Sequence, residues 1–327
     1  MITGLNAFMR GRKASAYLVC ATALCCVLSA CSGSGGGGTG GGTGGGGGGG
    51  GNDSGSPATT LSCNGYPQPV QVSVNNTEQT YTQVCLITQQ NPQITPSLNV
   101  TTVAGNLAGH GQDKLSAFTV YARIIAQAAD EATATTLAKS VVVSTANGSV
   151  SATPDKVDFP EMLQIDYEVF TAPTTNLTLK SAAGNMSVDN YDATLQLTPT
   201  AGNTSLSNVD GKATVNSTKG NISLSNVNGQ VTVDTTAGNI GASLSGASWS
   251  GAGLSATTQA GNIAVSRPAG YQATITATVD AGVASIDDRS ATSTPGPPPA
   301  PGIVTVGSGA PIKLESKAGN VSVGTAQ

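Results

Sequence analysis

The sequence predicts an all-β protein built as a right-handed parallel β-solenoid, with about 18 residues in each coil and one short helix. Three observations predict this fold class. A Gly-Asn turn returns every 18 residues between positions 183 and 239, and apolar residues fall into columns at the same spacing. The composition, with only 4% aromatic and 10% charged residues and many Gly, Thr, Ser, Asn and Val, is typical of short strands joined by tight turns.

The coil that starts at Asn221 shows the repeat most clearly. Ile222, Leu224, Val231 and Val233 alternate with polar residues, which is the pattern of a half-buried strand. One such coil cannot bury its own apolar face, so neighbouring coils must stack on it. Its length allows two long strands or three short ones, and parallel crossovers are overwhelmingly right-handed. An antiparallel β-sandwich is the alternative architecture.

The asparagines of the repeated turn are expected to form a ladder. Glycine tolerates a positive φ at each turn, and asparagine is the next best residue for that conformation. Coils stack at roughly 4.8 Å, a spacing at which side-chain amides can hydrogen-bond up and down the stack. The predicted ladder consists of Asn185, Asn203, Asn221 and Asn239.

Residues 1–30 are predicted to be a lipoprotein signal peptide. A basic stretch ends at Lys13, an apolar run extends to Leu28, and small residues precede Cys31, which is the order of a secretory signal. The tetrapeptide Leu-Ser-Ala-Cys that ends at Cys31 resembles the lipobox of bacterial lipoproteins. The resemblance implies cleavage before Cys31, lipidation of this cysteine and attachment to a membrane. Ser32 lacks the acidic character of an inner-membrane retention signal and favours the outer membrane. The alternative is an ordinary signal peptide with a chance cysteine.

Two segments are expected before the solenoid. Residues 31–60 comprise the lipidated cysteine and a Gly-rich tether, because nearly pure glycine cannot bury apolar surface. Residues 61–97 form an irregular strand segment in which Cys63 and Cys85 are predicted to pair. An even pair of cysteines in an exported protein is most simply a disulfide. The solenoid domain is expected to cover residues 98–327.

Other elements of the solenoid domain are less regular than the repeat. The stretch from Asp130 to Lys139 is acidic at its start and basic at its end, which predicts the helix. The turn 104–106 is expected to be an early, degenerate copy of the Gly-Asn turn, and one coil carries an insertion near 246–253. The Pro-rich stretch 294–302 is a loop. Strands are expected at 98–100, 118–121, 141–143, 149–152 and 163–170, and the last strands at 303–306, 312–315 and 318–323.

The charge of the chain argues against a nucleic-acid partner. Arg10, Arg12 and Lys13 lie in the signal, so 11 of the 14 basic side chains remain against 18 acidic ones, a net charge of −7. The mature chain has no basic patch of the kind that binds nucleic acid.

Neither a cofactor nor a metal site is predicted. The one histidine, His110, lies in a Gly-rich context that is typical of a flexible loop, without a Gly-x-Ser-x-Gly elbow. Metal ligation is disfavoured because there is no second histidine and no Cys-x-x-Cys motif. Tandem calcium-binding repeats are absent too.

Acidic residues are interpreted as surface features of loops, not as catalysts. Five carboxylates surround two prolines in a stretch that is typical of a solvated loop entering a strand: Asp155, Asp158, Glu161, Asp166 and Glu168. A charged turn accounts for residues 287–289. Polysaccharide lyases need a basic residue near clustered carboxylates, and the arginines of the folded part are Arg123, Arg267 and Arg289. The chain is therefore predicted not to be an enzyme.

The whole order of features resembles a known family. An export signal, short alternating strands, a helical break, Gly-Asn repeats and a final Ala-Gly-Asn-Val are similar to the bacterial putative-adhesin proteins built of β-strand repeats, whose domain has no known function. The resemblance covers roughly residues 98–325 and is most specific at 177–244 and 309–320. It implies an envelope-facing β-solenoid without established catalytic residues.

The expected function is therefore that of a lipid-anchored envelope protein for adhesion or scaffolding. Its partners would be a membrane, through the anchor, and a surface polysaccharide or a protein as ligand. Two alternatives stay open: a polysaccharide-active β-helix enzyme, with Arg123, Asp166 and Asp287 as the residues to test, and an envelope signalling accessory protein that uses residues 61–97 and the helical break.

Overall fold

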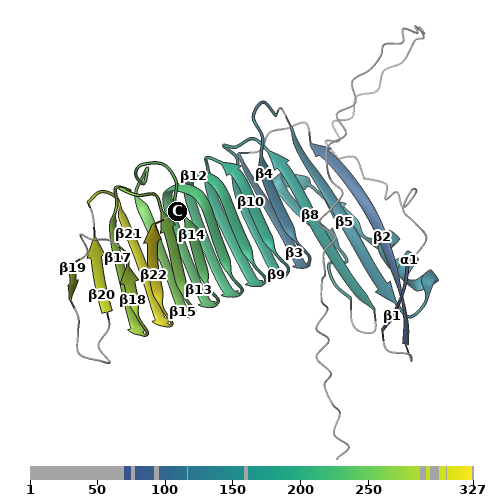
Figure 1. Cartoon of the computed structure of the whole chain (residues 1–327). Coiled ribbons are helices and arrows are strands. Elements are labelled where there is room, and N and C mark those ends of the chain that lie inside the picture. The colour runs from purple at the N-terminus through teal and green to yellow at the C-terminus, as the bar shows by residue number, and fades with distance from the viewer. Residues whose placement is uncertain are drawn as a thin grey trace, which may run out of the picture. The chain divides into compact units, whose positions relative to one another are not determined.

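The computed structural model describes residues 70–74, 78–91, 96–115, 117–157, 161–287, 292–294, 302–306 and 308–325 (Figure 1). All of them belong to one compact unit of the chain, Ser54–Gln327. The strands are β1 (Val70–Val74), β2 (Glu78–Asn91), β3 (Ser97–Ala104), β4 (Leu107–Gly111), β5 (Phe118–Ala128), β6 (Val142–Ser144), β7 (Ser149–Thr153), β8 (Met162–Thr171), β9 (Asn176–Ala183), β10 (Met186–Tyr191), β11 (Thr194–Ala201), β12 (Thr204–Lys219), β13 (Ile222–Ala237), β14 (Ile240–Ser243), β15 (Gly253–Ala260), β16 (Ile263–Arg267), β17 (Thr274–Ala281), β18 (Ala284–Ile286), β19 (Thr292–Thr294), β20 (Gly302–Val306), β21 (Pro311–Ala318) and β22 (Val321–Thr325). The helix is α1 (Glu131–Ser140), and a short 3-10 turn spans Ala146–Gly148.

Each regular coil contains two strands, which confirms the predicted β-solenoid and decides between two and three strands. A strand such as β11 ends at the Gly-Asn turn, and the chain returns through the first half of β12. A second turn near residues 208–211 leads into the next coil. Strands of successive coils pair in parallel at the 18-residue offset, for example Leu206 with Leu224 and Val215 with Val233. The right-handed sense of the coils stays a prediction.

The two strands of each coil belong to two layers, called A and B here. In pairing order, layer A comprises β7, β3, β9, β11, residues 212–219 of β12, residues 230–237 of β13, β15, β21 and β17. Layer B comprises β8, β4, β10, residues 204–209 of β12, residues 222–227 of β13, β14, β16, β22 and β18.

The apolar columns of the repeat form the core of this stack. Leu195, Ala213 and Val231 are in register in layer A, and all three are buried. Leu206 and Leu224 do the same in layer B. Burying an aliphatic side chain contributes about 1.5–3 kcal/mol, and these columns run through every regular coil, so stacking provides the stability that one coil lacks.

At both ends of the stack, the order of coils in space differs from their order in the sequence. The coil of β3 and β4 lies between β7/β8 and β9/β10, although β7 and β8 follow it in the chain. The coil of β21 and β22 lies between β15/β16 and β17/β18, although it follows both in the chain (Figure 1). The turn 104–106 thus belongs to a complete coil. The strands β20, β21 and β22 are the last in the chain, as predicted, but the sequence did not indicate that β21 and β22 lie between two earlier coils.

Two loops are hydrogen-bonded to each other where the chain runs from β16 to β17, which lie on either side of the coil of β21 and β22. The insertion, residues 244–252, lies where the sequence predicted it, between β14 and β15. Its Trp249 is buried and donates its indole N–H to the carbonyl of Gly229 at 3.0 Å. Residues 268–273 connect β16 to β17, and Gln272 donates its backbone N–H to the carbonyl of Ala247 at 2.8 Å. Tyr271 of this connection is also buried.

Antiparallel strands flank the parallel stack, which the sequence did not predict. At one end β8 pairs with β5, β5 with β2 and β2 with β1. At the other end β20 pairs with β17 and with β19. Residues 61–97 were expected to be an irregular strand segment, and this segment includes the 14-residue strand β2, which pairs with β5 along 11 residue pairs. These antiparallel strands cover the edge of layer B at β8 and the edge of layer A at β17.

The helix matches its prediction to within one residue. Asp130 is the N-cap, and its carboxylate accepts hydrogen bonds from the backbone N–H and the hydroxyl of Thr133 at 2.8 and 2.7 Å. These bonds lower the pKa of Asp130, because they stabilise the charged form. Ala134 and Ala138 are buried on the side that packs against β2 and β5.

Candidate functional site

The Gly-Asn turns form a continuous column along the stack. Gly202 has a φ of +132°, and a Cβ atom at this position would lie 2.0 Å from the carbonyl oxygen of Gly184 in the neighbouring coil. Only glycine allows two backbones to approach so closely. The same contact, at 1.9–2.0 Å, recurs at eight turns, those of Gly105, Gly184, Gly202, Gly220, Gly238, Gly261, Gly319 and Gly282.

The asparagines that follow these glycines form a hydrogen-bonded ladder. The backbone N–H of Asn203 donates to Oδ1 of Asn185 at 2.9 Å, and that of Asn221 donates to Oδ1 of Asn203 at 3.0 Å. Bonds between amide groups were expected; instead, each amide oxygen mainly accepts from the backbone of the next coil. In spatial order the ladder comprises Asn106, Asn185, Asn203, Asn221, Asn239, Asn262 and Asn320.

Three members of the ladder lie outside the predicted set. Asn106, Asn262 and Asn320 carry the same Gly-Asn dipeptide but stand at other spacings in the sequence. The Gly-Asn dipeptide was the sequence signal that could have identified these three residues. The spatial order of the coils was needed to place them in the ladder. The ladder thus continues unbroken through both places where the coil order changes.

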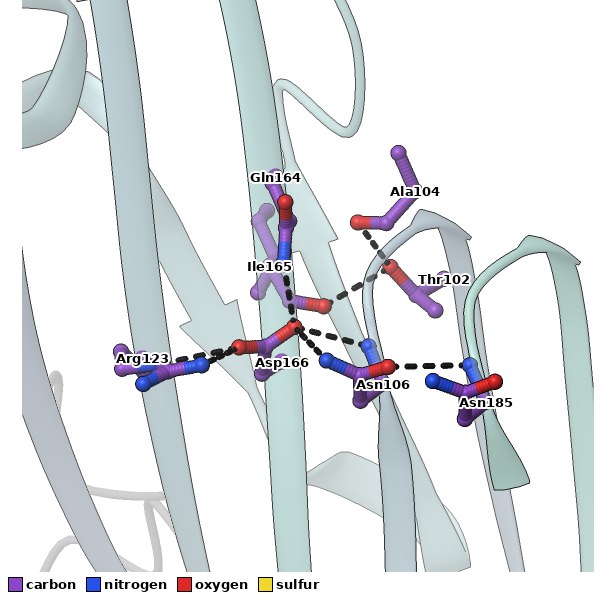
Figure 2. A network of polar contacts seen from close by, with 8 residues as sticks. All are labelled: Thr102, Ala104, Asn106, Arg123, Gln164, Ile165, Asp166 and Asn185. Atoms are coloured by element: carbon purple, nitrogen blue, oxygen red, sulfur yellow. Dashed lines mark hydrogen bonds and ion pairs between the residues drawn. The ribbon is translucent and has the colours of Figure 1, made fainter. Parts of the chain in front are cut away.

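At its first end the ladder meets a buried carboxylate. Asp166 of β8 takes the position of an asparagine, and its Oδ1 accepts the backbone N–H of Asn106 at 2.7 Å and the side-chain amide of Gln164 at 2.9 Å (Figure 2). Its Oδ2 accepts two guanidinium N–H groups of Arg123 on β5, one of them at 2.9 Å. Asp166 was interpreted as part of a solvated loop that runs into the strand 163–170; it lies in that strand, but it is only 8% exposed and its acceptors are occupied.

At the other end the ladder stops at a residue without an acceptor. The backbone N–H of Val283 donates to Oδ1 of Asn320 at 2.9 Å. Val283 stands where the other coils have asparagine, so its side chain has no oxygen to offer to a further coil. This residue is 64% exposed. The two ends therefore differ chemically: one is an ion-paired carboxylate and the other is an apolar side chain.

A second asparagine column follows the other turn of the coil. Asn190, Asn208 and Asn226 have φ values of +62°, +51° and +52°. The amide of Asn208 donates to Oδ1 of Asn190 at 3.2 Å, and that of Asn226 donates to Oδ1 of Asn208 at 2.8 Å. These are the amide-to-amide bonds that were expected at the first turn. The sequence shows this turn at the same 18-residue spacing, but no ladder was predicted there.

His110 is the centre of a charged cluster on the outer face of layer B. It lies in strand β4, not in the expected flexible loop. Its Nδ1 is 2.5 Å from Oδ1 of Asp189 on β10, and its Nε2 is 3.3 Å from Oε1 of Glu168 on β8. The ring stacks on Phe170 with centroids 4.9 Å apart, and Tyr121 meets the same phenylalanine edge-on. The histidine thus links three adjacent strands where antiparallel pairing gives way to parallel pairing.

Two tyrosines are buried beneath this cluster. Burial raises the pKa of Tyr191 to about 12, although its hydroxyl shares a 2.8 Å hydrogen bond with the hydroxyl of Thr171. Burial also raises the pKa of Tyr167 well above its usual value. Its hydroxyl has no hydrogen-bond partner among the residues whose side chains are described. Both phenols are core groups and do not reach the outer face.

The candidate catalytic residues do not come together in one site. Arg123 and Asp166 form an ion pair at the β5–β8 end of the stack. Asp287 follows β18, and seven strands of layer B separate β8 from β18 in the pairing order. The buried Arg267 donates to the carbonyl of Asp287 at 3.4 Å. Asp155 follows β7 and Glu161 precedes β8. Asp158, Asp288 and Arg289 lie outside the described residues.

Several predicted sites fall on parts of the chain that the structure does not describe. Cys31 and Cys63 lie outside the described residues, and for Cys85 only the backbone of β2 is described, so lipidation and the disulfide stay predictions. Within the described ranges, no group of three or more His, Cys, Asp or Glu residues is placed to hold a metal ion. Nor does any described helix have the length and apolarity to cross a membrane.

The outer face of layer B is lined by small hydroxyl side chains and is hollowed at one end. Ser187, Ser205 and Ser223 are in register, and so are Ser207, Ser225 and Ser243. Farther along, small residues replace serine at Gly241, Ala264 and Gly324. A shallow groove of about 810 Å³ crosses β13, β14, β16, β22 and β18 there.

Comparisons with known proteins give a family match and more distant structural likenesses. The model of the DUF4097 Toastrack family matches residues 68–288. A putative cell adhesion protein from Clostridium sporogenes ATCC 15579 is 11% identical, with a TM-score of 0.28 over 73% of this chain and 99% of that protein. A putative adhesin from Bacteroides fragilis NCTC 9343 is 14% identical, with a TM-score of 0.38 over 74% of this chain and 97% of that protein. No curated protein matches the chain significantly.

The family match covers more than half of the chain and starts at residue 68, so it includes β1 and β2 as well as the regular coils. The matched residues include parallel strand pairs, most of the Gly-Asn column and most of the β-rich core. The chain therefore belongs to the DUF4097 Toastrack family.

Proposed function

We propose that the protein is a non-enzymatic component of a bacterial cell envelope, anchored by a lipid on Cys31, whose β-solenoid presents polar faces for adhesion or scaffolding. The observation that carries the proposal is the stack itself. Its coils are joined by parallel pairing, two asparagine columns and a continuous core, while its outward residues are mostly Ser, Thr, Asn and Gln. Such a body offers a rigid, repetitive surface to a partner.

The two outer faces offer different chemistry to that partner. Layer B carries rows of serine and the shallow groove. Layer A carries rows of larger residues, for example Thr214 in register with Thr232 and Asn216 in register with Asp234. Hydroxyl and amide groups of this kind hydrogen-bond well to sugar hydroxyls and to peptide groups. A polysaccharide or a protein surface is therefore the class of ligand that these faces fit best.

The anchor is tested by labelling cells with palmitate and treating them with an external protease. Wild type and Cys31→Ala are compared, with Cys85→Ala as the matched control that removes a different cysteine. The proposal predicts label in wild type and in Cys85→Ala but not in Cys31→Ala. It also predicts that the protease releases a stable fragment from intact cells. Label that persists in Cys31→Ala would refute the anchor, and a protected chain would refute surface display.

Binding of a ligand by the outer faces is tested by lysine substitutions on one face at a time. Ser205→Lys with Ser223→Lys alters layer B, and Thr214→Lys with Thr232→Lys alters the same coils in layer A. These pairs lie on the outside of the stack, so the fold should persist by circular dichroism. Binding of intact cells to glycan and protein surfaces should fall for one pair and persist for the other. Equal binding by wild type, both variants and cells without the protein would refute adhesion.

A further inference from the structure

The coil of β21 and β22 fills a slot between two other coils. In layer A, β21 pairs with β15 on one side and β17 on the other, and in layer B, β22 pairs with β16 and β18. At the turn, the backbone N–H of Gly261 donates to the carbonyl of Ala318 at 2.9 Å, and that of Gly319 donates to the carbonyl of Ala281 at 2.9 Å. The pairs of this coil are thus made with strands that precede it in the chain.

The fit of this coil depends on the repeat pattern. Four buried side chains enter the core: Ile312, Leu314, Val321 and Val323. Asn320 occupies its place in the ladder, donating to Asn262 at 2.8 Å and accepting from Val283 at 2.9 Å. A Cβ atom at Gly319 would lie 2.0 Å from the carbonyl oxygen of Gly261. These contacts specify a coil of the right pattern, whichever chain supplies it.

The strands around this coil allow it to move as part of one unit. It is preceded by β20, which pairs with β17, and by β19, which pairs with β20. Among the described residues, no strand follows β22. The other displaced coil, β3/β4, is connected to described strands on both sides. Strands β19 to β22 can therefore separate together from the rest of the stack without any other described strand or helix having to move through them.

We propose that the slot between β15/β16 and β17/β18 binds the β21/β22 coil of a second copy of this chain, so that two molecules exchange strands β19 to β22. A second copy supplies the same side chains and the same Gly-Asn turn, so the contacts within the slot are equal in the two arrangements. The coil of the same chain is favoured because it is covalently connected to the slot, which acts as an effective concentration of about millimolar. Exchange of an identical element is a general route to symmetric dimers.

The test uses two full-length variants that can be joined by a disulfide only after exchange. Thr257 of β15 and Glu315 of β21 are directly opposite each other on the outer face of layer A. One population carries Thr257→Cys and the other Glu315→Cys. They are mixed in denaturant, refolded together at a series of concentrations up to about millimolar, and oxidised. Exchange predicts a covalent dimer of the two variants, and its share should rise with concentration as the second copy competes with the own coil.

Three controls make the result decisive. Thr257→Cys and Glu315→Cys in one chain should cross-link internally, which checks the geometry. Thr214→Cys and Thr232→Cys in separate chains probe an internal pair of coils, β12 and β13, and should give no specific dimer. Mixed wild-type chains report the background from the natural cysteines. Gly319→Ala added to the Glu315→Cys chain should abolish the dimer, because the donated coil no longer fits.

The proposal is overturned if the Thr257→Cys and Glu315→Cys mixture gives no more dimer than the wild-type and β12–β13 controls while the single-chain pair cross-links. It is also overturned if the dimer forms equally with Gly319→Ala, since that result would indicate a surface contact between intact molecules.

Discussion

The close approach of glycines at successive Gly-Asn turns is a steric constraint that makes a quantitative prediction. In Gly202→Ala, the new Cβ would lie 2.0 Å from the carbonyl oxygen of Gly184, where an ordinary contact needs at least 3.4 Å. The coils must therefore separate locally, which weakens the 2.9 Å bond from Asn203 to Asn185 and the 3.1 Å bond from Gly202 to the carbonyl of Lys219. These two bonds contribute about 1 kcal/mol each.

The backbone conformation adds a separate cost. At a φ of +132°, alanine is strained by about 1–3 kcal/mol. Together with the two hydrogen bonds, the expected loss for Gly202→Ala is about 3–5 kcal/mol in the free energy of unfolding. The measurement is urea unfolding followed by circular dichroism. Hydrogen exchange of the neighbouring coils should show where the opening occurs, because solenoids can unfold in parts.

Two other glycines separate strain from steric contact. Gly246 has a φ of +73°, but a Cβ atom there would have no neighbour within 4 Å, so Gly246→Ala should cost only about 1–2 kcal/mol. Gly324 has neither a positive φ nor a close neighbour, so Gly324→Ala should change stability by less than about 0.5 kcal/mol. The reasoning is refuted if Gly202→Ala costs no more than Gly246→Ala.

Three further predictions concern the first end of the stack. Asp166→Ala should lose about 2–3 kcal/mol, because it leaves the guanidinium of Arg123 and a backbone N–H without their acceptor. Asp166→Asn keeps an acceptor and should lose less; equal losses in thermal unfolding would contradict this role. The folded-state pKa of Tyr191 is about 12 against an ordinary 10.0, so the unfolded phenol ionises first and stability should fall as pH rises from 10 to 12, by roughly 3 kcal/mol. Tyr191→Phe removes the hydrogen bond to Thr171, so the free energy of unfolding at neutral pH should fall by about 1 kcal/mol. In urea titrations the variant should lose less stability between pH 10 and 12 than the wild type. An unchanged loss would show that other groups cause the alkaline decline. Tyr167→Phe removes a buried hydroxyl that has no partner among the described side chains and should raise the unfolding free energy by about 1 kcal/mol, whereas a loss in the same assay would mean that the hydroxyl is satisfied.

Local physical rules were sufficient to predict the regular part of the molecule. The alternation around Ile222 and Leu224 indicated which side chains are buried, and the 18-residue spacing indicated which of them share a column. The helix could be predicted because Asp130 and Lys139 stand at its two ends. These signals depend only on residues within one coil or on its nearest neighbours, so the sequence expresses them directly.

The polar contacts at the first end could not be predicted in this way. Asp166 and Arg123 are 43 residues apart, and His110 is 79 residues from Asp189. Their strands become neighbours only because β5, β8, β4 and β10 pair in that order. A lone histidine among glycines and a carboxylate near prolines carry no local sign of such partners. The distances along the chain are the reason that His110 was interpreted as a loop residue and Asp166 as part of a solvated loop that runs into a strand.

The displaced coils show why repetition itself limits prediction. A Gly-Asn turn with flanking apolar residues fits on either side of any similar coil, so the apolar columns and the close glycine contact do not by themselves decide whether the coil of Asn320 lies at the end of the stack or between Asn262 and Val283. What distinguishes the two orders lies elsewhere. Val283 offers no side-chain acceptor, so the coil of β17 and β18 extends the ladder only from one side. With the coil of β17 and β18 last, every asparagine oxygen of the ladder accepts a hydrogen bond. With this coil between Asn262 and Asn320, the backbone N–H of Asn320 would face Val283 and the ladder would be interrupted. The single replacement of asparagine by valine in Ala281-Gly282-Val283 therefore favours the observed order. This departure from the repeat is the sequence feature that indicates which coil lies at the end of the stack.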